Sequence, residues 1–225
     1  MPVKEDREYR NFNNFELRAA EDAEETTGGG VVEGYASTFE EYDIMTFDMG
    51  NGSREIWREQ IAPDAFNNAD MSDVVFLRDH AGQVYARTKN NLIAIMPDER
   101  GLYTRTDLTK TTGAREMYED IKAGNYTQMS FAFRVSRDGE TWETIREGND
   151  VIYKRNITAI DKVFDISAVA FPANPTTDIA PATRAAFNGA IEELRAERLE
   201  AERKAKDRAR EMLKLKIKIM EGSKS

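Results

Sequence analysis

Residues 125–135 read NYTQMSFAFRV and alternate in character from one residue to the next. Successive side chains of a β-strand point to opposite faces of the sheet. One face of this strand therefore carries Thr127, Met129, Phe131, Phe133 and Val135, and the other carries Gln128, Ser130, Ala132 and Arg134. We expect the first set to fill a core and the second set to look outward, where the hydroxyl of Ser130 can meet a ligand.

Short runs with strand character lie on both sides of this stretch. They cover residues 11–19, 31–39, 55–61, 74–78, 91–96, 102–108, 151–158 and 162–171, and residues 136–149 look like a polar loop. Helical signals are fewer: Pro63 opens a short helix, and residues 112–123 place apolar side chains at helical spacing before Gly124. Strands that follow one another with little strand–helix alternation favour an α+β, mostly β fold, either a barrel or a sandwich.

The C-terminal region differs in composition from the rest of the chain. The segment FPANP at 171–175 ends the strand region because proline cannot continue a ladder, and we place the boundary between residues 1–182 and 183–225. Residues beyond it are rich in strong helix formers and predict a charged helix, with a formal charge of about +4 against about −13 for the body. The stretch LKLKIKI at 213–219 alternates and is compatible with either a helix or a strand.

Composition excludes several kinds of chemistry. The chain of 225 residues has no cysteine and one histidine, so a thiol nucleophile, a disulfide scaffold and a Cys/His zinc site are absent. The net charge of −9 argues against nonspecific nucleic-acid binding. No apolar run approaches the roughly 20 residues of a membrane span, and residues 1–12 lack the apolar region of a secretory signal, so we expect cytosolic synthesis.

His80 and Ser130 are the first candidates for catalysis. His80 is the only imidazole of the chain and follows the apolar strand at 74–78. Imidazole can take and return a proton near neutral pH, so His80 is the general base if the protein is a serine hydrolase. Considered singly, Ser130 also fits a surface strand serine, and His80 fits a histidine paired for structural reasons.

An acid is needed to orient such an imidazole, and Asp165 is the first candidate. It interrupts the apolar strand KVFDISAVAF, where an unpaired buried charge would be costly. A pair with a structural arginine is the alternative, and Asp79 and Asp161 are the other acids considered. Ser167 lies on the same strand with no base assigned to it.

Six blocks in order resemble the prohead maturation proteases of tailed bacteriophages, distant relatives of the herpesvirus capsid protease. The blocks are VEGYASTF, IAPDAF, VVFLRDH, RGLYTRTDL, IKAGNYTQMSFAF and KVFDISAVAFPANP, and they span about residues 32–175. The resemblance assigns the catalytic histidine to His80 and the nucleophile to Ser130. Asp165 stands where the family more often carries Glu, and Arg134 is a geometric candidate for the oxyanion donor.

The resemblance also implies a fold and a function. The fold is a closed antiparallel β-barrel flanked by helices, like that of the herpesvirus protease, with the active site on its outer wall. The function is serine endopeptidase cleavage, without a cofactor, of the scaffold, of the scaffolding segment of the major capsid protein, and of the protease itself. The implied place of action is the procapsid interior in the host cytoplasm, and a homo-oligomer is left open. The alternative is a noncatalytic capsid-assembly protein.

Overall fold

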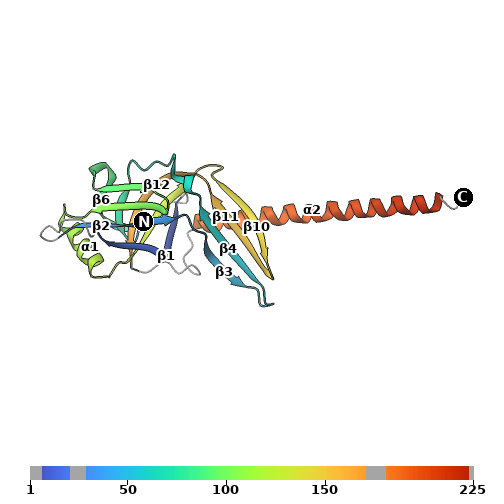
Figure 1. Cartoon of the computed structure of the whole chain (residues 1–225), viewed down its shortest axis with the longest axis horizontal. Helices are drawn as coiled ribbons and strands as arrows, with labels where there is room; N and C mark the ends of the chain where they lie inside the picture. The colour runs from blue at the N-terminus through green and yellow to red at the C-terminus, as the bar shows by residue number, and fades with distance from the viewer. Residues whose placement is uncertain (1–6, 21–28, 171–180, 223–225) are drawn as a thin grey trace. The chain divides into compact units, whose positions relative to one another are not determined.

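Two β-sheets form the framework of the protein in the computed structural model, which describes residues 7–20, 29–170 and 181–222 (Figure 1). The larger sheet has eight strands in the order β6 (Ala81–Arg87), β5 (Val75–Arg78), β12 (Ile160–Val169), β9 (Gln128–Val135), β1 (Glu8–Ala19), β2 (Val31–Thr38), β8 (Gly101–Asp107) and β7 (Ile93–Pro97). The smaller sheet has four, in the order β10 (Glu140–Glu147), β11 (Asp150–Ile157), β4 (Arg54–Ile61) and β3 (Tyr42–Asp48).

Neighbouring strands are antiparallel except for two pairs, β12 with β5 and β11 with β4. The helical elements are the α-helices α1 (Thr112–Lys122) and α2 (Pro181–Gly222) and the short 3-10 turns η1 (Pro63–Phe66) and η2 (Thr88–Asn90). The expectation of an α+β, mostly β fold is confirmed. Strands β3, β6 and β10 were not expected, and β10 lies inside the segment read as a polar loop.

The expected closed barrel is wrong for the described residues. Closure requires the two edge strands of the larger sheet to pair, yet β6 pairs with β5 and β7 pairs with β8, and no ladder joins β6 to β7. Pro97 ends β7 without a backbone N–H to donate, and residues 81–84 of β6 are exposed. Helix α1 contacts β1 and β6 and inserts its apolar face, Ala114, Met117, Tyr118 and Ile121, into the core.

Local chemistry explains where α1 begins and ends. The hydroxyl of Thr111 accepts a hydrogen bond from the backbone N–H of Ala114 at 3.1 Å, which caps the helix. Gly124 follows with φ of +82°, a left-handed conformation that suits glycine.

Strand β9 is covered on both faces. Met129, Phe131 and Phe133 fill the core as expected, because their side chains alternate inward. Ser130 and Ala132, on the opposite face, are also fully buried. The expectation that this second face looks out to solvent is therefore wrong at Ser130, because the alternation of a strand defines two faces without saying what covers them.

A buried ionic network joins the two sheets through β1. Arg10 Nε lies 2.5 Å from Glu59 Oε1 on β4, and Arg155 of β11 binds both Glu8 Oε2, at 2.6 Å, and Glu59 Oε2, at 3.0 Å. The Thr183 hydroxyl lies 3.0 Å from both Arg10 Nη1 and Glu8 Oε2. Removing one member of such a network leaves a buried charge without a partner, which typically lowers the free energy of unfolding by about 3–5 kcal/mol.

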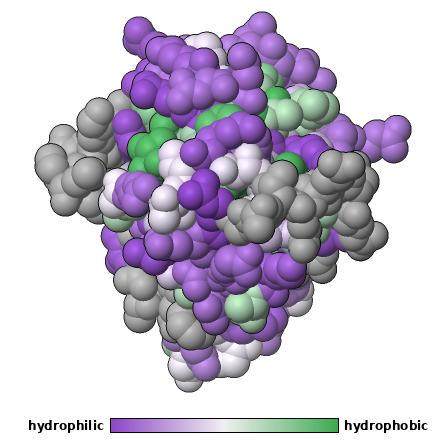
Figure 2. Space-filling view, turned by 90° about the vertical axis from the view of Figure 1, so that its left-hand side faces the viewer, coloured by the Kyte–Doolittle hydropathy of each residue, from purple (hydrophilic) through white to green (hydrophobic). Residues whose placement is uncertain are grey.

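The chain divides into two compact units, residues 1–184 and residues 185–225. Helix α2 begins in the first unit, so Thr183 belongs to the body, and the helix continues to Gly222. The segment 213–219, for which a strand was an alternative, is helical. None of the described helices combines the length and apolarity that crossing a membrane requires. Figure 2 shows a predominantly hydrophilic face with a small apolar area in a hollow.

Candidate active site

His80 sits in a two-residue turn between β5 and the edge strand β6. Arg78 pairs with Ala81, and the two residues between them, Asp79 and His80, have positive φ angles of 47° and 56°. Two successive positive φ angles are typical of a type I′ hairpin turn, which usually favours Asn and Gly. The backbone N–H of Asp79 donates to Ala168 O at 3.1 Å, which ties the turn to β12. The turn thereby holds the imidazole over the larger sheet.

The imidazole of His80 bridges the other two candidates. Its Nε2 lies 2.5 Å from Ser130 Oγ, and its Nδ1 lies 2.6 Å from Asp165 Oδ1. A carboxylate only accepts hydrogen bonds, so Nδ1 carries the proton and Nε2 is left to accept from the Ser130 hydroxyl. Residues 80, 130 and 165 are far apart in sequence and come together here through the sheet.

The pairing register explains how the two strand residues meet. On β9 and β12, Ser130 pairs with Ser167 and Ala132 pairs with Asp165. Directly paired residues of neighbouring strands have side chains on the same face. Asp165, Ser167 and Ser130 therefore share one face of the larger sheet, the face over which the His80 turn lies.

Ser167 is part of the site, although sequence reasoning assigned it no role. Its hydroxyl donates to Asp165 Oδ1 at 3.0 Å and accepts from the backbone N–H of His80 at 3.2 Å. It therefore fixes both the acid and the turn that carries the imidazole. The signal was present in the sequence, because Ser167 is two residues from Asp165 on a strand and must lie on the same face.

Tyr9 is a second contact that sequence reasoning missed. Its ring meets the imidazole of His80 edge-on, with centroids 4.7 Å apart and planes at 71°. Tyr9 pairs with Ala132, which puts it on the Ser130 face, whereas its neighbours Glu8 and Arg10 enter the ionic network on the other face. The position of Tyr9 against His80 is thus held by buried charges on both sides of it.

The site is closed around the serine and more open at the imidazole. Ser130 and Ser167 are fully buried, while 15% of the His80 side chain and 4% of the Asp165 side chain are exposed. The oxygen Oε1 of Gln128, two residues before Ser130 on the same face, is buried with no hydrogen-bond partner among the described residues.

The other residues considered from the sequence lie differently. Arg134 binds Asp161 through Nε at 2.8 Å, and both side chains are substantially exposed. Ser130 and Arg134 are four residues apart, about 13 Å along the strand, so the suggestion that Arg134 is an oxyanion donor is not supported. Asp79 precedes His80 in the turn, but the described carboxylate bonded to the ring belongs to Asp165. No cluster suited to a metal ion occurs among the described residues.

This arrangement has the chemistry of a serine hydrolase: a hydroxyl bonded to an imidazole, which is itself bonded to a carboxylate. The family model of the caudovirus prohead serine protease matches residues 13–190, and the chain belongs to this family. The family is one of serine peptidases that act in phage prohead maturation. Searches of curated proteins and of solved structures returned no match.

Proposed function

We propose that the protein is a serine endopeptidase in which Ser130 is the nucleophile, His80 the general base and Asp165 the acid that orients the imidazole. The observation that carries the proposal is the placement of His80, whose two ring nitrogens lie within hydrogen-bond distance of Ser130 and Asp165.

The reaction is acyl transfer in two stages. His80 takes the hydroxyl proton of Ser130 as Oγ attacks the peptide carbonyl, and the proton then passes to the leaving amine as the C–N bond breaks. Water, deprotonated by the same imidazole, attacks the acyl-enzyme and releases the acid product. Asp165 stays hydrogen-bonded to Nδ1 and stabilises the imidazolium that forms in each stage.

The substrates proposed are proteins of the assembling procapsid. Membership of the prohead protease family supports the scaffold, or the scaffolding segment of the major capsid protein, as the substrate inside the procapsid. Cleavage of the protease itself is part of the proposal.

We extend the proposal to the tail: residues from about Arg184 onward recruit the protease into the procapsid and are not needed for the chemistry. The support is the formal charge of about +4 on the helix-forming segment, which suits an acidic partner surface.

The test is co-expression with the capsid protein of the same phage, followed by mass spectrometry of the fragments. Ser130→Ala should abolish all cleavage in a protein that keeps its far-UV circular dichroism. Ser136→Ala, just beyond the same strand, is the matched control and should cleave normally. Full cleavage with Ser130→Ala would overturn the assignment of the nucleophile. Absence of cleavage with the parent protein would favour a noncatalytic assembly protein.

A further inference from the structure

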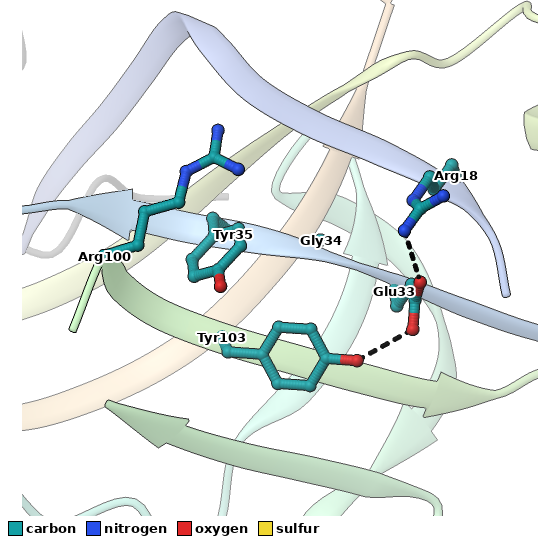
Figure 3. Close-up of a pocket in the computed structure, with 6 residues that line it drawn as sticks. All are labelled: Arg18, Glu33, Gly34, Tyr35, Arg100 and Tyr103. Carbon is teal, nitrogen blue, oxygen red and sulfur yellow. Dashed lines mark hydrogen bonds and ion pairs between the residues drawn. The ribbon is translucent and has the colours of Figure 1, made fainter. Parts of the chain in front are cut away.

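A pocket of about 170 Å³ lies on the outer face of the larger sheet, away from the candidate triad (Figure 3). Its lining comes from β1, β2, β8 and the turn before β8: Arg18, Glu33, Gly34, Tyr35, Arg100 and Tyr103. In Figure 3, Arg18 and Arg100 stand on opposite sides of the pocket, with the two tyrosine rings between them.

The pocket opens on the same face of the sheet as Ser130. Leu17 of β1 and Met129 of β9 both point into the core, so Arg18 and Ser130, one residue further along their strands, point to the opposite side. Leu17 pairs with Gly34, and its N–H donates to Thr127 O at 3.0 Å, so Gly34 lies level with the start of β9. The pocket is therefore two strand spacings from Ser130 across the sheet and two to three residues from it along the strands. Together these two offsets amount to roughly 13 Å.

Two carboxylates at or near the pocket already have several partners each. Glu33 is engaged by Arg18, by Arg105 at 3.0 Å and by the hydroxyl of Tyr103 at 2.8 Å. Asp98 accepts from the Tyr35 hydroxyl at 2.6 Å and from two backbone N–H groups.

Arg100 differs from the other arginines at the pocket. Its guanidinium stacks over the Tyr35 ring, 4.6 Å from the centroid, and no ion pair with a carboxylate of the described residues occupies it. Among the arginines that line the pocket, Arg18 is paired with Glu33, whereas Arg100 has no ion pair with a carboxylate of the described residues. The ligand that fits is therefore anionic.

Gln128 lies on the way from the nucleophile to this pocket. It shares the face of Ser130, and its buried oxygen Oε1 lacks a partner among the described residues. Gln128 as a whole is half-buried, so a rotation of its side chain would bring this oxygen to the backbone N–H groups of a peptide that extends from Ser130 toward the pocket. The separation of roughly 13 Å corresponds to about four residues of extended chain.

We propose that this pocket is a specificity subsite that binds an acidic side chain of the substrate about four residues from the scissile bond, with Gln128 accepting a substrate N–H between them. The inference rests on the proposed endopeptidase function. Arg100 supplies the positive charge that favours an acidic side chain, and the ring of Tyr35 holds its guanidinium in place.

The experiment uses a peptide library made by digesting a whole proteome. The purified protein cleaves the library, and mass spectrometry reads the residues around each new cut. With the parent protein, Asp and Glu should be enriched about threefold to fivefold at one position three to five residues from the cut, as expected for a solvent-exposed ion pair. Arg100→Gln should lose this enrichment, and Arg100→Glu should replace it by Lys and Arg.

Two controls separate the possible causes. Arg146→Gln, which changes another exposed arginine, on β10, should leave the acidic preference unchanged. Gln128→Met, similar in size but without the acceptor, should slow cleavage of acidic and neutral peptides by the same factor. An acidic preference that is absent, or that survives Arg100→Gln, would overturn the subsite. Failure of the parent protein to cut any peptide, or cutting by Ser130→Ala, would instead overturn the proposed function on which the subsite rests.

Discussion

The ring of Tyr9 packs edge-on against the imidazole of His80, with the two centroids 4.7 Å apart. Tyr9 lies before residue 13, where the family match begins, so this contact comes from a segment outside the matched region. The aromatic contact limits rotation of the imidazole away from Ser130 and Asp165. In the proposed enzyme Tyr9 is thus a positioning residue that acts through His80.

The first prediction follows from that contact. Tyr9→Ala should lower kcat by about 10-fold to 100-fold with little change in KM, because misplacement of a catalytic group affects the chemical step. Tyr9→Phe keeps the ring and should stay near the parent rate. His80 is the only histidine, so its imidazole NMR signal is unambiguous and should shift in Tyr9→Ala when the ring current is lost. An unchanged signal would mean that the two rings are not in contact in solution.

The acid of the triad gives a second prediction. Asp165→Asn should reduce kcat by about 10⁴-fold, since an amide stabilises the wrong tautomer of the imidazole and cannot balance its charge. Some cleavage above that of Ser130→Ala should remain, because Ser130 and the binding groups are intact. Single-turnover kinetics on one peptide measures the cleavage rates of the two variants, Asp165→Asn and Ser130→Ala. Parent-like activity of Asp165→Asn would move the role to another acid, with Asp79 the first to examine.

Replacing Ser167 should lower kcat less than replacing a residue of the triad, but more than replacing a surface serine. Ser167→Ala removes the hydroxyl that donates to Asp165 and accepts from the His80 backbone, so we expect about a tenfold loss in kcat, the effect of one hydrogen bond to a charged group. Ser136→Ala serves again as the control. Equal rates for the two variants would show that Ser167 does not support the imidazole.

The ionic network predicts how stability depends on pH. Burial alone would raise the pKa of Glu8, but the charges and hydrogen bonds of Arg10 and Arg155 outweigh it and hold this pKa well below the usual range. A carboxyl whose pKa is lowered in the folded state stabilises the fold above its unfolded pKa, about 4.3. That contribution is lost progressively as the pH falls below this value toward the folded-state pKa.

The variant Glu8→Gln tests this dependence of stability on pH. At pH 7 we expect it to lower the free energy of unfolding by about 3 kcal/mol, because Arg10 and Arg155 lose a charged partner. The difference from the parent should shrink between pH 5 and pH 3, about the range in which an unfolded glutamate titrates. Urea denaturation at several pH values measures it. A constant difference across this range would show that the ionised carboxylate of Glu8 is not the stabilising group.

The last prediction concerns the charged tail. A chain ending at Arg195 keeps every residue of the family match and loses most of the exposed part of α2. It should cleave peptides at the parent rate yet be missing from isolated procapsids. A truncated protein that cleaves normally and still enters procapsids would contradict a recruiting role. One that aggregates would assign the tail to the stability of the fold.

Much of the fold could be predicted from local patterns, because strands such as β9 and β12 alternate clearly and α1 has a cap and a glycine at its ends. Strand β10 was missed because ETWETIRE is polar and largely exposed, so its pairing with β11 stabilises it without an apolar signal. Barrel closure was predicted wrongly because pairing between distant strands depends on tertiary contacts. The relation of Ser130 to Asp165 depends on the same kind of contact, the register between β9 and β12.

The position of β1 between β9 and β2 has a consequence for biosynthesis. Its residues leave the ribosome before their partners on β9, which follow more than one hundred residues later, and before β12, which follows later still. Contacts so distant in sequence form slowly and late. Tyr9, His80, Ser130 and Asp165 can therefore meet only when the body has been almost fully translated. In the proposed enzyme this order of synthesis would keep the nascent chain inactive as a peptidase until residues as far as β12 have been made.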